Sequence, residues 1–210
     1  MQMEMFNLNM LRLDQMSKNK GYLKIVSMDP SMSNWGLITA YLYLDNDELE
    51  VEELHVIQPE KQKEAKQVRT NSKDINIAEQ LIQGIIPHLE DADVIIAEVP
   101  VAGQNARACV SYAMCVSIIG AINTSFPKVI EVTPGEVKLN VKKNASKQEM
   151  IAWATKKHPE ADWKYKTIKG KRTIIAGHAE HVSDAIGALY AALKTAELKS
   201  IINSVKRFIK

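Results

Sequence analysis

Short apolar runs separated by polar turns occupy the first 60 residues of the chain. Residues 22–28, 35–44 and 49–57 are such runs, and the turn-forming cluster Asp45-Asn46-Asp47 divides the second from the third. Apolar runs of this length, with partial alternation of apolar and polar positions, are typical of β-strands. Because the connections are short, the three runs predict an antiparallel meander.

The middle of the chain alternates between helical and strand patterns. Residues 58–73 are polar and predict a loop or the ragged beginning of a helix, and residues 75–86 then repeat isoleucine and leucine at roughly helical spacing. A short apolar run at 93–99 predicts a fourth strand, residues 106–123 a buried helix rich in small side chains, and residues 128–132 a fifth strand.

Two helix starts are marked by capping residues. Thr133 is followed by Pro134 and, three positions after the threonine, by Glu136; Ser146 is followed three positions later by Glu149. In this pattern the hydroxyl and the glutamate each accept a hydrogen bond from a backbone N–H of the first turn. We therefore expect one helix to begin after residue 133 and another after residue 146.

The rest of the chain predicts one loop and two more helices. The basic segment 163–172 contains Gly170 and predicts a loop, whereas residues 179–193 have helical apolar spacing and residues 197–210 could add a short helix. The order of three strands, helix, strand, helix, strand and then helices is typical of an α/β domain with a mixed sheet. The predicted organisation is an N-terminal arm at 1–20, one domain at 21–195 and a basic C-terminal tail at 196–210.

Composition favours a cytoplasmic globular protein, and its small size would suit a bacterial or phage-infected cell. The hydrophobic content is 46% and no apolar run is long enough to span a bilayer, so no membrane association is expected. Residues 1–20 lack the basic and apolar regions of a signal peptide and predict a loosely packed arm or a dimer contact. Cys109 and Cys115 are too few for a disulfide framework and are expected to be reduced and packed.

Charge is distributed unevenly along the chain. Residues 128–210 carry 17 basic against 8 acidic side chains, a net charge of +9, whereas residues 1–127 carry 10 against 17, a net charge of −7. A basic region of this kind favours nucleic acid as a partner, although a solvated lysine-rich surface is the simpler alternative.

Three acids occupy apolar surroundings. Asp29 follows Ile25-Val26-Ser27-Met28, Glu98 follows Val94-Ile95-Ile96-Ala97, and Asp184 lies on the apolar side of the last predicted helix of the domain. Burying an ionised carboxylate is costly unless it is paired or binds a cation, and Mg²⁺ prefers oxygen ligands. The three acids therefore predict a magnesium site, for which the first and fourth strands must be neighbours. Singly, each acid could instead be a cap, an ion-pair partner or an exposed helix residue.

In this order the acids lie in segments that resemble the motifs of RuvC-type Holliday junction resolvases. Residues 25–36 resemble the first motif and 94–98 the second. Residues 134–138 and 145–150 resemble the basic stretch before the last catalytic helix, and 181–188 resemble the final motif. The resemblance implies an RNase H-like fold with a mixed five-stranded sheet flanked by helices, a homodimer, and paired nicking of branched DNA at a four-way junction. It also implies 5′-phosphate and 3′-hydroxyl products.

The resemblance further implies a catalytic set of Asp29, Glu98, Asp184 and His181, which would bind two Mg²⁺ ions, with Mn²⁺ able to substitute. Family members often have an acid three residues before the final Asp, where this chain has His181. Glu180 is therefore the alternative fourth ligand. A supporting role for His181, without metal coordination, stays open. A zinc site built on His178 is discounted because its spacing is weak.

Basic residues supply the expected DNA contacts. Lys138 and Lys147 match positions where the family places cations near the scissile phosphate, and Lys147 is expected to act in catalysis. The family's aromatic residues after the second motif are missing from 99–105, and the loop at 163–172 could replace them. The predicted DNA-binding residues are Lys138, Lys142, Lys143, Lys147, Lys164, Tyr165, Lys166, Lys169, Lys171 and Arg172.

Two rival functions stay open at this point. One is an RNase H-like nuclease that cuts flaps, Y-branches or RNA–DNA hybrids, because fold does not determine substrate. The other is a non-catalytic DNA-binding scaffold, although a scaffold has no need of three acids near phosphate.

Overall fold

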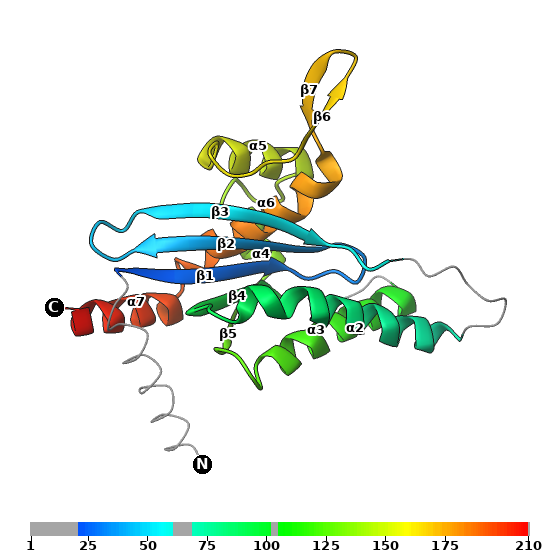
Figure 1. The fold of residues 1–210 in the computed structure, drawn as a ribbon, viewed down its shortest axis with the longest axis horizontal. Coiled ribbons are helices and arrows are strands. Elements are labelled where there is room, and N and C mark those ends of the chain that lie inside the picture. The colour runs from blue at the N-terminus through cyan, green and yellow to red at the C-terminus, as the bar shows by residue number, and fades with distance from the viewer. Residues whose placement is uncertain (1–20, 61–68, 102–104, 210) are drawn as a thin grey trace.

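The computed structural model describes residues 21–60, 69–101 and 105–209 (Figure 1). The predicted N-terminal arm at 1–20, with its proposed dimer contact, lies outside the described residues. No helix in the described ranges is long and apolar enough to cross a membrane.

A mixed five-stranded sheet forms the centre of the fold. Its strand order is β3-β2-β1-β4-β5. The first three strands pair antiparallel, and β4 and β5 continue the sheet in parallel with β1, which confirms the predicted sheet. The bounds are β1 (Tyr22–Asp29), β2 (Trp35–Tyr43), β3 (Leu49–Ile57), β4 (Val94–Glu98) and β5 (Val129–Val132).

Helices cover both faces of the sheet. α2 and α3 share one apolar core with the sheet, and α6, which contacts all five strands, forms the larger core on the other face together with α4, α5 and α7 (Figure 1). The bounds are α2 (Thr70–Leu89), α3 (Ala106–Ile122), α4 (Pro134–Lys138), α5 (Lys147–Lys157), α6 (Ala176–Ala192) and α7 (Ala196–Ile209).

The predicted helix starts of α4 and α5 are confirmed. Thr133 and Ser146 are the N-caps, and each forms a complete capping box with the glutamate three residues later. The C-terminal helix α7 has Leu198 and Val205 buried in the larger core, so this segment packs on the domain through an apolar stripe.

Two local predictions were wrong. The segment predicted as a loop contains a β-hairpin, β6 (Tyr165–Ile168) and β7 (Lys171–Ile174), whose turn residues Lys169 and Gly170 both have positive φ. Such a two-residue turn matches the twist of the paired strands. In Figure 1 the hairpin extends away from the body of the domain.

Helix α3 was predicted to be buried, but only one of its faces is. Cys115, Ile118, Ile119 and Ile122 are buried, whereas Cys109 is exposed and therefore not packed as expected. Small residues allow close packing on any side, but α3 has a single neighbouring layer, the sheet and α2, so its other side faces solvent.

Candidate metal and nucleic-acid site

The sheet brings two of the three predicted acids to one edge. β1 ends at Asp29 and β4 ends at Glu98, and the parallel pairing of Met28 with Ala97 places the two acids side by side in neighbouring strands. This is the strand adjacency that the predicted metal site required.

Helix α6 brings the third acid. The hydroxyl of Ser27 in β1 donates a buried hydrogen bond of 2.8 Å to the carbonyl of Ala185, the residue that follows Asp184. This contact joins positions 158 residues apart in sequence and fixes the helix across the end of β1. Asp29, Glu98 and Asp184 are named the acid cluster below.

Burial and neighbouring negative charge raise the pKa of two carboxyl groups of the acid cluster, Glu98 and Asp184. Burial, followed by the charges of Asp29 and Asp184, raises the pKa of Glu98 from 4.5 to about 8. Burial, followed by the charges of Asp29 and Glu180, raises the pKa of Asp184 from 3.8 to about 7. Desolvation and like charge both disfavour the ionised carboxylate, so the site concentrates negative charge that is only partly offset.

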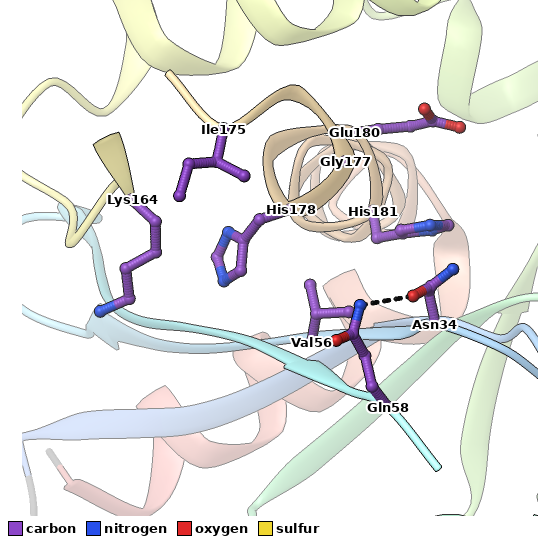
Figure 2. Close-up of a pocket in the computed structure, with 9 residues that line it drawn as sticks. All are labelled: Asn34, Val56, Gln58, Lys164, Ile175, Gly177, His178, Glu180 and His181. Atoms are coloured by element: carbon purple, nitrogen blue, oxygen red, sulfur yellow. Dashed lines mark hydrogen bonds between the residues drawn. The ribbon is translucent and has the colours of Figure 1, made fainter. Parts of the chain in front are cut away.

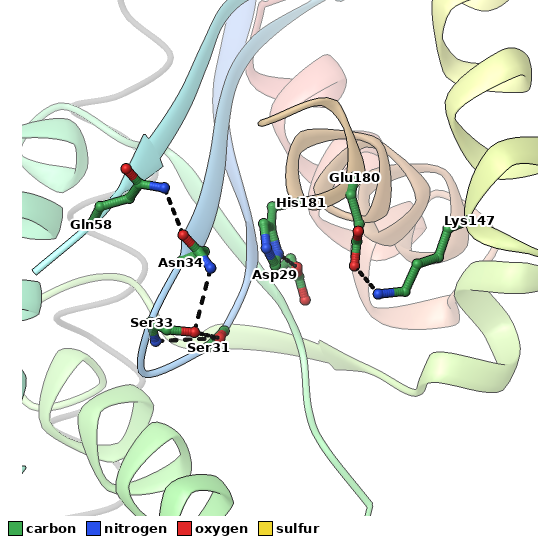
Figure 3. Close-up of polar contacts among 8 residues, drawn as sticks. All are labelled: Asp29, Ser31, Ser33, Asn34, Gln58, Lys147, Glu180 and His181. Atoms are coloured by element: carbon green, nitrogen blue, oxygen red, sulfur yellow. Dashed lines mark hydrogen bonds and ion pairs between the residues drawn. The ribbon is translucent and has the colours of Figure 1, made fainter. Parts of the chain in front are cut away.

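His181 is joined directly to the acid cluster (Figure 3). Its Nδ1 lies 2.8 Å from Oδ2 of Asp29, and the two side chains are only 17% and 16% exposed. This hydrogen bond is the main reason why the pKa of His181 is raised. The expected proximity of His181 to Asp29 is therefore present in the structure.

A glycine allows this approach. A Cβ added at Gly36 would lie 2.5 Å from the carbonyl oxygen of His181 and 2.9 Å from its Cβ. Any larger residue at position 36 would push β2 away from α6, so the glycine of the first motif has a direct steric role beside the site.

Glu180 and Lys147 form an ion pair at the border of the cluster (Figure 3). The contact with Glu180 is the main reason why the pKa of Lys147 is raised, and the charges of Asp184 and Asp29 add to it. Lys138 lies close enough to lower the pKa of both Glu98 and Asp184. Lys147, the predicted catalytic lysine, and Lys138, predicted to contact DNA, thus both lie within electrostatic reach of the acids.

A cavity of about 670 Å³ adjoins His181 and Glu180 (Figure 2). It lies between the N-terminal end of α6, the ends of β2 and β3, and the base of the hairpin. Its polar lining includes Asn34 and Gln58, which share a hydrogen bond of 2.6 Å, and Lys164. The sequence did not indicate the cavity, because its walls come from four segments that only the tertiary fold brings together.

The hairpin carries most of the other predicted DNA-binding residues. Tyr165 is exposed, and the guanidinium of Arg172 lies 4.0 Å from the centre of its ring. Lys166, Lys169 and Lys171 are exposed beside them. Trp163 is instead buried, and its ring N–H donates to the carbonyl of His158 at 2.7 Å, so it is unavailable for stacking on bases.

Three more predicted DNA-binding lysines are exposed. Lys142 and Lys143 precede α5 in the chain, and Lys164 follows it. Lys142 forms an ion pair with Glu149, and Lys164 forms one with Asp162. Exposed pairs of this kind contribute little to stability, so both lysines can exchange their partners for phosphate at small cost.

A second group of metal-ligating side chains was missed by sequence reasoning. Within the described ranges, one set of three such residues has ligand atoms that all lie within 4.8 Å of one another: Glu53, His55 and His88. The acid cluster is more open than this, as expected of carboxylates that repel one another. The Glu-x-His spacing in β3 was the available sequence signal, but nothing local pointed to His88.

No protein-family model and no curated protein matches the sequence. Solved structures of Holliday junction resolvases do match the fold. Thermus thermophilus RuvC in complex with a Holliday junction is 12% identical, with 81% of this chain and 96% of that chain covered and a TM-score of 0.54. The yeast mitochondrial resolvase is 14% identical, with 93% and 91% covered and a TM-score of 0.51.

Fowlpox virus resolvase, solved with Holliday junction DNA, is 12% identical, with 82% of this chain and 100% of that chain covered and a TM-score of 0.51. These similarities extend over nearly the whole length of each resolvase. They confirm the predicted RNase H-like fold of the resolvase type.

Proposed function

We propose that this chain is a divalent-metal-dependent endonuclease that resolves four-way DNA junctions. One observation carries the proposal: Asp29, Glu98 and Asp184, from two strands and a helix, converge at one edge of a sheet whose fold is shared with junction resolvases. Two of those resolvases have been solved with Holliday junction DNA.

The donor set fits a hard divalent cation. The pKa values of Glu98 and Asp184 are raised by burial and then by the charge of Asp29, so the ionised cluster needs a positive partner. Asp29, Glu98, Asp184 and the imidazole of His181 would hold two Mg²⁺ ions, with Glu180 in reserve, and Mn²⁺ would substitute because it accepts imidazole more readily. Bound there, the metal would supply an activated water and offset charge on the phosphodiester.

The side chains around the cluster have separate roles in this proposal. His181 orients the Asp29 carboxylate through the 2.8 Å hydrogen bond. Lys147 leaves Glu180 and contacts the scissile phosphate, where its charge offsets the negative charge that develops in the transition state. Lys138 lowers the cost of ionising Glu98 and Asp184. The products would be a 5′-phosphate and a 3′-hydroxyl.

DNA would lie along the basic side of the molecule. Lys142 and Lys143 would contact phosphates close to the cluster, and the hairpin would reach further along the substrate. The exposed Tyr165 ring, held under Arg172, is the available group for stacking on a base at an open branch point. The hairpin would thus replace the aromatic residues that the segment 99–105 lacks.

Paired cleavage requires two copies of the chain, and α3 supports a homodimer. Val110 and Val116 are each 45% exposed and Tyr112 is 37% exposed on α3, outside its buried stripe. A second copy would cover these apolar side chains and place two acid clusters on one junction. Sedimentation equilibrium of the wild type and of Val116→Glu tests this, because the charge should dissociate the dimer.

The test of function is cleavage of a synthetic four-way junction beside a flap, a Y-branch, a linear duplex and an RNA–DNA hybrid. Each substrate is incubated with Mg²⁺, Mn²⁺ or EDTA. Paired nicks confined to the junction, absent with EDTA and with Asp29→Asn, are expected. Asp91→Asn, an exposed aspartate in the turn before β4, is the matched control and should cut normally.

The other outcomes separate the rival functions. Equal cutting of flaps or hybrids would leave the metal site standing but refute junction specificity. Junction binding without cleavage under any metal would identify a scaffold and refute the enzyme.

A further inference from the structure

A group of nitrogen and oxygen ligands lies on the face of the sheet covered by α2. Glu53 and His55 belong to β3, and His88 lies in the last turn of α2. The acid cluster lies on the other face, because Asp29 contacts His181 of α6, and α6 covers the opposite side of the sheet. The sheet therefore separates this group from the acid cluster.

A β-bulge creates this arrangement. The register of β2 and β3 shifts so that Thr39 pairs with Glu53 and Ala40 with Val51, which leaves Glu52 as the extra residue. Without the bulge, Glu53 would share a face with Val51, in the core under α6. The extra residue turns Glu53 and His55 together towards α2, and bulges commonly redirect side chains in this way.

The distances suit a small cation. Nε2 of His55 lies 3.3 Å from Oε2 of Glu53, and Nδ1 of His88 lies 4.0 Å from the same oxygen. Ligands about 2.0–2.1 Å from a tetrahedral zinc ion are roughly 3.4 Å from one another. The two distances from Glu53 are thus close to the spacing that one shared ion requires, and all three ligand atoms lie within 4.8 Å of one another.

The surroundings help to hold the ligands in place. The hydroxyl of Thr39, which is buried, donates to Oε2 of Glu53 at 3.3 Å, in the manner of residues that orient a metal ligand. The rings of His55 and His88 lie 4.4 Å apart. Partial burial and the neighbouring His55 lower the pKa of His88, which favours the neutral imidazole that a metal requires. Lys24 is the nearby cation that opposes metal binding.

We propose that Glu53, His55 and His88 form a second metal site, selective for Zn²⁺ or a similar late first-row cation, that ties β3 to the end of α2. Two imidazoles and one carboxylate are donors that favour such ions over Mg²⁺. The fourth coordination position faces solvent and would hold water. The site joins segments more than 30 residues apart, so metal binding would stabilise the fold independently of catalysis.

The test must separate this site from the acid cluster, which can also bind metals. The full chain carrying Asp29→Asn and Asp184→Asn is titrated with Zn²⁺ against a chromophoric chelator, with circular dichroism to verify folding. One equivalent of Zn²⁺ is expected to bind. Adding His88→Gln should weaken binding more than about tenfold. Adding Glu50→Gln, on the same strand but outside the group, should have no effect.

A second measurement locates the ion in the wild-type chain. With Mg²⁺ in excess, Zn²⁺ should shift the imidazole NMR signals of His55 and His88 and leave those of His158 unchanged. Co²⁺ should give the visible absorption of a tetrahedral nitrogen and oxygen site. Binding unaffected by His88→Gln, no binding in the Asp29→Asn/Asp184→Asn chain, or Zn²⁺ shifts at His181 instead would overturn the proposal.

Discussion

Replacing Glu98 with glutamine should make the metal-free protein more stable at alkaline pH. The pKa of Glu98 is about 8 in the fold, against an ordinary value of 4.5. Between these two pH values the folded state binds more protons than the unfolded chain, so the free energy of unfolding falls as pH rises. Below about pH 4.5 the carboxyl is neutral in both states and the penalty is absent.

The size of the effect follows from the same displacement. Each unit of pKa corresponds to about 1.4 kcal/mol, so the ionised carboxylate costs up to about 5 kcal/mol above pH 8. Burial is the largest cause of the shift, followed by the charges of Asp29 and Asp184, so neighbouring carboxyl groups can adjust their protonation when Glu98 ionises. We therefore expect removal of the single charge of Glu98 to gain only part of this cost, roughly 2 kcal/mol, at pH 8.

The assay is thermal unfolding at pH 5 and pH 8 in EDTA, followed by circular dichroism. Because 1 kcal/mol shifts the Tm of a domain of this size by about 2–4 °C, Glu98→Gln should melt about 4–8 °C above wild type at pH 8 and close to it at pH 5. Mg²⁺ should raise the Tm of the wild type more than that of the variant. Glu131→Gln, exposed on β5, is the matched control and should leave both values unchanged.

The reasoning is refuted if Glu98→Gln melts at or below the wild-type temperature at pH 8 in EDTA. That result would mean that the carboxylate is solvated or paired in the folded protein. The inference that the acid cluster needs a bound cation would then be wrong. A gain in stability that is equal at pH 5 and pH 8 would point to packing instead of charge.

Three further predictions concern the surroundings of the cluster. Gly36→Ala should lower stability by about 1–3 kcal/mol and abolish cleavage, because its Cβ would lie 2.5 Å from the carbonyl of His181, whereas Gly120→Ala, with open space around it, should be tolerated in a melting experiment. Lys147→Gln should slow single-turnover cleavage by about 100-fold while changing stability by less than about 1 kcal/mol, since its ion pair is exposed; a rate within twofold of wild type would exclude its catalytic role. Tyr165→Ala should weaken junction binding about tenfold and leave linear-duplex binding unchanged in fluorescence anisotropy, and equal loss on both substrates would exclude stacking at a branch point.

The sheet was predictable from sequence because its signals are local. Apolar runs ended at turn residues, and Asp29 and Glu98 each closed such a run, so their adjacency required only that β1 pair with β4. The capping boxes at Thr133 and Ser146 were equally local, since each is complete within four residues.

The hairpin was missed because it carries no core signal. All four residues of β6 are exposed, so no apolar alternation marks the strand. Its one signal was the pair Lys169-Gly170 between two segments with β-branched and aromatic residues, and position 169 has positive φ, which lysine rarely adopts. The basic composition of the segment therefore predicted a loop, whereas the tight turn at Lys169 and Gly170 makes it a hairpin.

The site depends on long-range packing in a way that explains what sequence could and could not predict. The acids at positions 29, 98 and 184 could be identified from the sequence. Their convergence, however, requires helix α6 to cross the sheet at a particular position along β1 and with a particular side turned towards it. The Ser27 hydrogen bond to Ala185 and the absence of a side chain at Gly36 set that position. Both contacts are buried and join segments that are far apart in sequence, and neither involves the side chain of an acid. The acid cluster should therefore be sensitive to small buried changes that leave every charged residue intact, and an enzyme with this architecture should lose activity before it loses its fold.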